Sequence, residues 1–145
     1  MKDVEELARI AVDCGFHLHK ELGPGLLESV YEAVLAIRLG KAGLLVERQK
    51  PISIEIDGVT LVEGFRADLV VERQLIIEIK SVERSSPVHA KQLLTYLRLA
   101  KQPVGLLMNF GCETFREGLK RVVNHHVNFA SSRLRVNHFP AAPEG

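Results

Sequence analysis

The feature that most constrains the fold is a pair of short alternating segments joined by three residues. Residues 65–71 and 75–80 both place an apolar side chain at every second position, which is typical of strands with one buried face. If Val71 pairs with Leu75 across the loop 72–74, seven apolar side chains form one continuous face. These are Phe65, Ala67, Leu69, Val71, Leu75, Ile77 and Ile79. A shift by one residue would place apolar side chains beside charged ones, so the pattern predicts an antiparallel hairpin in this register.

The same register gathers charged side chains on the opposite face, at the end of the hairpin farthest from its turn. Asp68 lies opposite Glu78 and Arg66 lies opposite Lys80, and opposed Cβ atoms are about 5 Å apart. Two adjacent carboxylates repel each other unless a positive charge lies between them. Mg²⁺ prefers such oxygen ligands and leaves its other positions to water and phosphate. A nearby lysine can hold an attacking water or neutralise charge that develops on phosphorus.

A second interpretation fits the same hairpin. Cross-strand ion pairs between Asp68 and Lys80 and between Arg66 and Glu78 would give an ordinary exposed sheet face, which is common in strands. The hairpin alone does not distinguish these interpretations, so support has to come from other segments.

Apolar spacing and turn residues predict the remaining elements. Asp3 is the expected N-cap of the first helix, Gly23-Pro24-Gly25 ends that helix, and Asp57-Gly58 is a hairpin turn signal. The predicted elements are helices at 3–22 and 27–43, strands at 52–56, 59–62, 65–71 and 75–80, a helix at 89–101, and strands at 104–110 and 119–123. This order predicts an α/β or α+β domain with a mixed β-sheet.

Two of the predicted helices carry polar side chains that could join a site. Gln92 and Tyr96 are four residues apart, so they share one stripe with His89, and Glu28 lies just after the glycine turn. For each residue alone a structural role is the simpler interpretation. A tyrosine often occupies the core with its hydroxyl hydrogen-bonded, and a glutamate at a helix N-terminus is favoured by the helix dipole.

Composition limits the class of protein. The 145 residues suit a single domain, and 19 Lys+Arg against 18 Asp+Glu exclude a strongly basic arm and an acidic tail. Two cysteines are too few for a disulfide scaffold or a zinc site, and no segment is apolar enough for secretion or a membrane span. We therefore expect a cytoplasmic protein with one domain at residues 1–127 and a partly disordered C-terminal tail at 128–145.

An ordered set of motifs resembles the GxxExxY proteins, a family of the PD-(D/E)XK nuclease-like superfamily. The resemblance runs from about residue 5 to residue 124. It rests on Gly25-Leu26-Leu27-Glu28-Ser29-Val30-Tyr31-Glu32, Gln49, Phe65-Arg66-Ala67-Asp68, Glu78-Ile79-Lys80, His89 with Gln92-Leu93-Leu94-Thr95-Tyr96, Gly105-Leu106-Leu107-Met108-Asn109-Phe110-Gly111, and Lys120-Arg121-Val122. Phe65 and Arg38 depart from the family pattern, where a tyrosine and an acid are expected.

The resemblance implies a restriction-endonuclease-like core, in which a mixed sheet is flanked by helices. It also implies that Asp68 and Glu78 bind Mg²⁺ or Mn²⁺ together with the Ile79 carbonyl, and that Lys80 is the catalytic lysine. Glu28 would approach the metal through water. Gln92 and Tyr96 would steady the lysine and the phosphate.

Two functions from different classes follow. The first is a metal-dependent nuclease that hydrolyses phosphodiester bonds in DNA, in which Arg66 or Arg121 could hold further phosphates. The second is a catalytically silent nuclease-fold module that binds nucleic acid or a partner protein, which the near-neutral charge favours. A homodimer would supply a longer substrate groove, because isologous dimers are the commonest oligomers. The intact acidic pair and lysine favour the nuclease.

Overall fold

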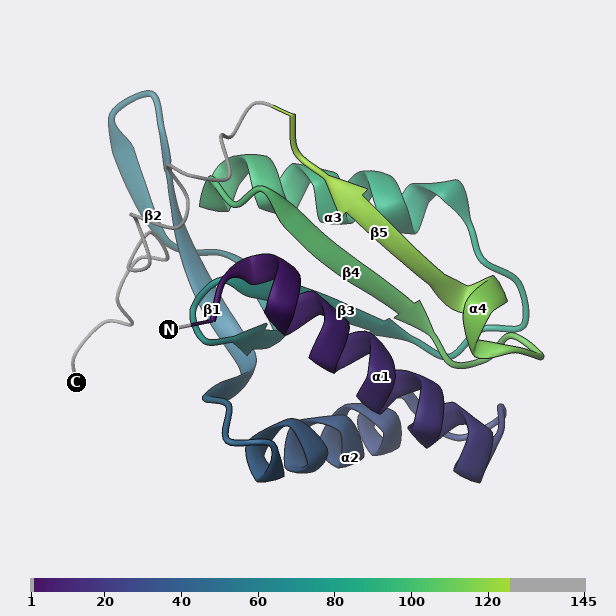
Figure 1. The fold of residues 1–145 in the computed structure, drawn as a ribbon. Coiled ribbons are helices and arrows are strands. Elements are labelled where there is room, and N and C mark those ends of the chain that lie inside the picture. Colours follow the sequence, from purple (N-terminus) through teal and green to yellow (C-terminus); the bar gives the residue numbers. More distant parts are fainter. Residues whose placement is uncertain (1, 126–145) are drawn as a thin grey trace.

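The computed structural model describes residues 2–125, and these residues form a three-layered domain around one five-stranded sheet (Figure 1). The elements in chain order are α1 (Val4–Leu22), α2 (Glu28–Lys41), β1 (Val46–Ile56), β2 (Val59–Val71), β3 (Leu75–Lys80), α3 (Pro87–Ala100), β4 (Val104–Asn109), α4 (Phe115–Gly118) and β5 (Leu119–Val123). The predicted tail at 128–145 lies outside the described residues.

The strands follow the order β1-β2-β3-β4-β5. All neighbours are antiparallel except β3 and β4, which are parallel and connected through α3. This mixed sheet with flanking helices confirms the predicted fold class. Figure 1 shows α1 and α2 on one face of the sheet and α3 on the other.

Each face of the sheet carries its own hydrophobic core. The first core packs α1 and α2 against the sheet and includes Leu7, Leu35 and Leu69. The second core packs α3 against the opposite face and includes Val70, Ile76 and Leu93. Successive strand residues point to opposite faces, so the residues of β3 alternate between the two cores. Because both faces are covered, β3 is almost entirely buried.

Local sequence signals account for the ends of several elements. The Asp3 side chain accepts from the backbone N–H of Glu6 at 3.0 Å and so caps α1 as predicted. Asp57 and Gly58 both have positive φ, at 53° and 75°, and connect β1 to β2 as the turn signal indicates. Ser86 caps α3, and Pro87 occupies its first turn.

The hairpin register between β2 and β3 is the predicted one. Val71 pairs with Leu75, and the ladder continues to Leu69–Ile77. It does not extend to a backbone pair between Arg66 and Lys80, so that predicted pairing is wrong. Arg66 instead pairs with Pro51 of β1, and its guanidinium binds Glu63.

The prediction of one continuous apolar face on the hairpin is also wrong. Phe65 and Ala67 pack in the second core, whereas Leu69 and Val71 pack in the first. The change of face coincides with Gln49 of β1, which has a left-handed φ of 47° and interrupts the β1–β2 ladder opposite Asp68. The register is the same on both sides of Gln49, at Arg48–Leu69 and Lys50–Ala67, so the change of face occurs without an inserted residue.

Most predicted bounds agree with the structure to within one or two residues, and the larger differences are in β1, β2 and α4. β1 begins at Val46 rather than 52, because its first half, Val46–Pro51, shows no simple apolar alternation. β2 runs without a break from Val59, where two separate strands were predicted, and the short helix α4 was not predicted. Among residues 2–125, no helix is long and apolar enough to cross a membrane.

Candidate active site

Asp68 and Glu78 meet where β2 and β3 separate, just beyond the last ladder pair. The backbone N–H of Asp68 donates to Oε1 of Glu78 at 3.2 Å, and the backbone N–H of Ile79 donates to Oδ2 of Asp68 at 2.8 Å. Each carboxyl group thus accepts from the other strand in place of a ladder carbonyl. The predicted proximity of the two acids is confirmed, although they meet through side chains rather than as a backbone pair.

Burial and repulsion keep the Glu78 carboxyl neutral. Its side chain lies on the α3 face among the second core, and the residue is 5% exposed. Burial, followed by the charge of the neighbouring Asp68 carboxylate, raises the pKa of Glu78 to about 9, while Lys80 opposes the shift. At neutral pH the Glu78 carboxyl therefore keeps its proton. Such a pair is poised to exchange its proton for a cation.

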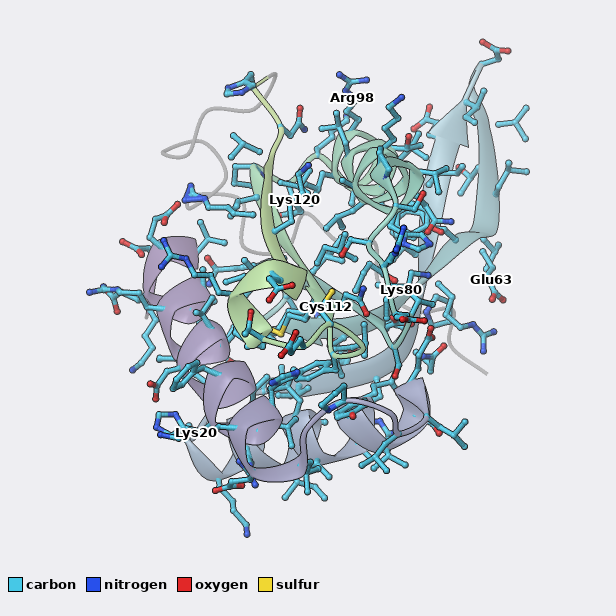
Figure 2. All side chains as sticks on the ribbon, turned by 90° about the vertical axis from the view of Figure 1, so that its right-hand side faces the viewer. Lys20, Glu63, Lys80, Arg98, Cys112 and Lys120 are labelled. Atoms are coloured by element: carbon cyan, nitrogen blue, oxygen red, sulfur yellow. The ribbon has the colours of Figure 1, made fainter. Side chains whose placement is uncertain are left out.

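Lys80 ends β3 on the same face as Glu78, because the two residues are separated by one position. Figure 2 shows Lys80 between α3 and the α1–α2 layer. The Lys80 side chain is partly exposed, and within residues 2–125 its ammonium forms no salt bridge. Its charge is therefore available to an anion that enters the site.

Tyr96 and Gln92 reach the acidic pair from α3. Burial, the Glu78 charge and the Asp68 charge raise the pKa of Tyr96, whereas a hydrogen bond from Gln92 lowers it. The ring of Tyr96 stacks on Phe65 of β2, with ring centroids 4.1 Å apart and planes 5° from parallel. The structure therefore brings the predicted Gln92 and Tyr96 to the same site as Asp68 and Glu78.

Glu32 and Gln49 are polar neighbours of the site that were not among the predicted site residues. Nε2 of Gln49 donates to Oδ1 of Asp68 at 3.1 Å and to Oε1 of Glu32 at 2.6 Å. Glu32 is 5% exposed and also accepts two hydrogen bonds from Arg48. Gln49 belongs to the family-like pattern, but only the fold shows what it contacts. A buried glutamate on a helix is the signal that could have drawn attention to Glu32.

Glu28 lies one helical turn before Glu32 on α2 and is exposed. It lines a pocket next to the site, together with Leu26, Ser81 and Glu83. No hydrogen bond within residues 2–125 joins Glu28 to Asp68, Glu78 or Lys80. A role for Glu28 that acts through water remains a prediction.

The two arginines considered for phosphate binding are both engaged in ion pairs outside the acidic pair. Arg66 is exposed and paired with Glu63, and Arg121 of β5 is paired with Glu5 of α1. Arg121 therefore faces the α1 side of the sheet, whereas Tyr96 and Gln92 approach from the α3 side. The structure does not bring Arg121 to the acidic pair.

The donor set fits a hard divalent cation. Asp68 and Glu78 offer carboxylate oxygens, and the carbonyl of Ile79 points to the same strand edge as its N–H, which is bound to Asp68. No cluster of three or more His, Cys, Asp or Glu side chains is present within residues 2–125. Two carboxylates with a carbonyl leave positions for water and phosphate, which is how Mg²⁺ is commonly held.

The comparisons with known proteins agree with this geometry. A family model described as the PD-(D/E)XK nuclease superfamily matches residues 5–122, which include every predicted site residue. Comparison with curated proteins and with solved structures gave no match, and the narrower likeness to GxxExxY proteins remains a prediction. The match covers most of the chain, and the mixed sheet has the expected flanking helices. The chain belongs to the PD-(D/E)XK nuclease superfamily.

Proposed function

We propose that this protein is a metal-dependent nuclease that hydrolyses phosphodiester bonds in DNA. The observation that carries the proposal is the Asp68–Glu78 pair, in which a buried glutamate with a raised pKa lies directly beside an aspartate. Maintaining a buried acid, Glu78, in contact with the partly buried Asp68 is unfavourable for the fold, and a bound Mg²⁺ or Mn²⁺ ion would relieve it. The family match independently supports nuclease chemistry.

Asp68, Glu78 and the Ile79 carbonyl would hold the ion. A divalent cation bound there supplies Lewis-acid activation of a phosphate and of water. The Asp68 carboxylate is held by the N–H groups of Ile79 and Gln49, so it keeps one orientation as substrate arrives. A carboxylate with a fixed orientation would hold the bound ion, and through it the phosphate and the water, in one geometry.

Lys80 and the α3 residues would act on the substrate. The ammonium of Lys80, free of a salt bridge within the described chain, would hold the attacking water or offset the charge that develops on phosphorus. The Tyr96 hydroxyl and the Gln92 amide would donate to phosphate oxygens and keep the Lys80 side chain in place. We also retain Glu28 as an acid that acts through water from the neighbouring pocket.

The test is an activity assay on purified protein with single-stranded DNA, double-stranded DNA and RNA, each with Mg²⁺ and with Mn²⁺. We expect cleavage of DNA by the wild type and none by a Glu78→Ala, Lys80→Ala double variant. The matched control is Glu55→Ala, Lys120→Ala, which also removes one acid and one lysine, but at exposed positions on β1 and β5.

The outcomes separate the two functional classes. Cleavage by the control but not by the double variant supports the nuclease and assigns the activity to this hairpin. Equal cleavage by all three proteins would identify a contaminant or another site. Absence of cleavage in every protein, combined with no Mn²⁺ binding by calorimetry, would favour the silent nucleic-acid-binding or protein-binding module instead.

A further inference from the structure

Gln49 connects the acidic pair to α2, and its backbone is strained. Its φ of 47° lies in the left-handed region, which is unfavourable for a residue with a Cβ. The β1–β2 ladder is formed on both sides of it, at Arg48–Leu69 and Lys50–Ala67, but not at Gln49 and Asp68. Such strain persists only where the surrounding structure enforces it, and it is frequent at functional sites.

The amide of Gln49 uses one nitrogen for two carboxylates. Nε2 donates to Asp68 and to Glu32, so both N–H groups of the amide are engaged. The amide orientation is fixed by chemistry, because carboxylate oxygens only accept hydrogen bonds and the carbonyl end of the amide cannot face them. Gln49 is thus a neutral donor between two acids that would otherwise repel each other.

Glu32 is firmly anchored on its other side. Nε and Nη2 of Arg48 both donate to Oε2 of Glu32, at 3.1 and 3.0 Å. Glu32 also follows Tyr31, whose fully buried ring stacks on Phe110 with centroids 4.6 Å apart. The position of the Gln49 amide is therefore supported by α2 and the first core.

We propose that Gln49 is a positioning residue that fixes the orientation of Asp68, with Glu32 and Arg48 as its support. The inference rests on the proposed metal-dependent function and extends it from the acidic pair to α2. Asp68 accepts at both carboxylate oxygens, from Gln49 at Oδ1 and from Ile79 at Oδ2. Without the Gln49 donor, the Asp68 carboxylate rotates about its last side-chain bond and the ligand set for the ion is misaligned.

The first experiment measures Mn²⁺ affinity by calorimetry on the full chain. Gln49→Met keeps the length of the side chain but cannot donate, and we expect it to weaken Mn²⁺ binding by about 10–100-fold, as loss of a hydrogen bond to a metal ligand typically does. The matched control is Gln74→Met, because Gln74 is 3% exposed and its amide donates to the Lys2 carbonyl, away from the site. The control should bind Mn²⁺ as the wild type does.

A glycine variant separates positioning from folding. Glycine adopts a φ of 47° without strain, so Gln49→Gly relieves the backbone while removing the side chain. We expect its melting temperature to stay near that of the wild type while its Mn²⁺ affinity falls with that of Gln49→Met. If both variants bind Mn²⁺ as tightly as the wild type, Gln49 does not position Asp68.

A second measurement needs no metal and stays decisive if the metal-dependent function fails. The Ile79 N–H donates to Asp68, so its hydrogen exchange followed by NMR reports how firmly the carboxylate is held. The reference is the backbone N–H of Ile77, a ladder residue on the same strand. We expect the Ile79 N–H to lose protection against hydrogen exchange relative to Ile77 in Gln49→Met. In Gln74→Met the protection of the Ile79 N–H should be unchanged. Unchanged Ile79 protection would overturn the positioning role. Loss of protection in a protein that binds no Mn²⁺ would contradict only the proposed function.

Discussion

The backbone N–H of Asp68 donates to the carboxyl group of Glu78, and this bond replaces the strand pairing that the two residues would otherwise form. This replacement of a backbone pair by a side-chain hydrogen bond occurs where β2 and β3 diverge, after the pair Leu69–Ile77. It turns an ordinary hairpin end into a site in which a buried glutamate and a partly buried aspartate are adjacent and held by backbone donors. The proposed chemistry depends on that local departure from a regular sheet.

Stability should fall as pH rises in the absence of a divalent ion. The pKa of Glu78 is about 9 in the folded protein, against an ordinary value near 4.5 when unfolded, so the folded state binds the extra proton between these values. The stabilisation is complete below pH 4.5 and is lost as pH rises through about 9, at up to roughly 1.4 kcal/mol per pH unit. Melting temperatures in EDTA from pH 5 to 9 measure it.

The matching variant for this prediction is Glu78→Gln, which keeps the shape of the side chain and its hydrogen bonding to Asp68. We expect Glu78→Gln to melt higher than the wild type at pH 8 and close to it at pH 5. An equal pH dependence of the two proteins would show that Glu78 is not the group responsible.

Binding of Mn²⁺ should release a proton. Because the raised pKa of Glu78 keeps its carboxyl protonated at pH 7, an ion that binds Asp68 and Glu78 has to displace that proton. We expect nearly one proton per ion at pH 7 and an apparent affinity that rises up to about tenfold per pH unit until pH 9. Calorimetry in buffers of different ionisation enthalpy gives the proton count. Proton-independent binding would place the ion elsewhere.

The hydroxyl of Tyr96 should matter for turnover and not for folding. Tyr96→Phe preserves the stacking on Phe65 but removes the hydroxyl near Asp68, Glu78 and Gln92. We expect the DNA cleavage rate to fall by about 10–100-fold, less than for Asp68→Asn, with an almost unchanged melting temperature. Steady-state kinetics and thermal denaturation test both statements. A wild-type rate in Tyr96→Phe would exclude the hydroxyl from the reaction.

Tyr31 should have the opposite profile. Its hydroxyl donates to the Gly23 carbonyl at 2.5 Å and accepts from the Leu26 N–H at 3.2 Å, so it closes the turn between α1 and α2. We expect Tyr31→Phe to lower the free energy of unfolding by about 1–3 kcal/mol, because both backbone groups lose their partner. Urea denaturation measures the change, with Tyr96→Phe as the comparison. A reduced DNA cleavage rate in Tyr31→Phe, with an unchanged free energy of unfolding, would contradict a purely structural role for Tyr31.

The sequence predicted the elements whose signals are local. Asp3, the glycine turn after α1 and Asp57-Gly58 each act within a few residues, and these positions agree with the structure. The hairpin register was also predictable, since only one register keeps Leu69, Leu75 and their apolar neighbours together near the turn. Farther from the turn the prediction was wrong, because Phe65 and Ala67 pack in the second core while Leu69 and Val71 pack in the first, a change of face that the alternation in the sequence does not show.

The acids and the lysine of the candidate site were identifiable from the sequence because their spacing on two adjacent strands sets their mutual position. Asp68, Glu78 and Lys80 are determined by strand alternation and one short loop. The link from Glu32 through Gln49 to Asp68 was decided only by the tertiary structure. It joins three elements that are distant along the chain, and it depends on a backbone conformation that side-chain packing enforces and that no local sequence preference favours.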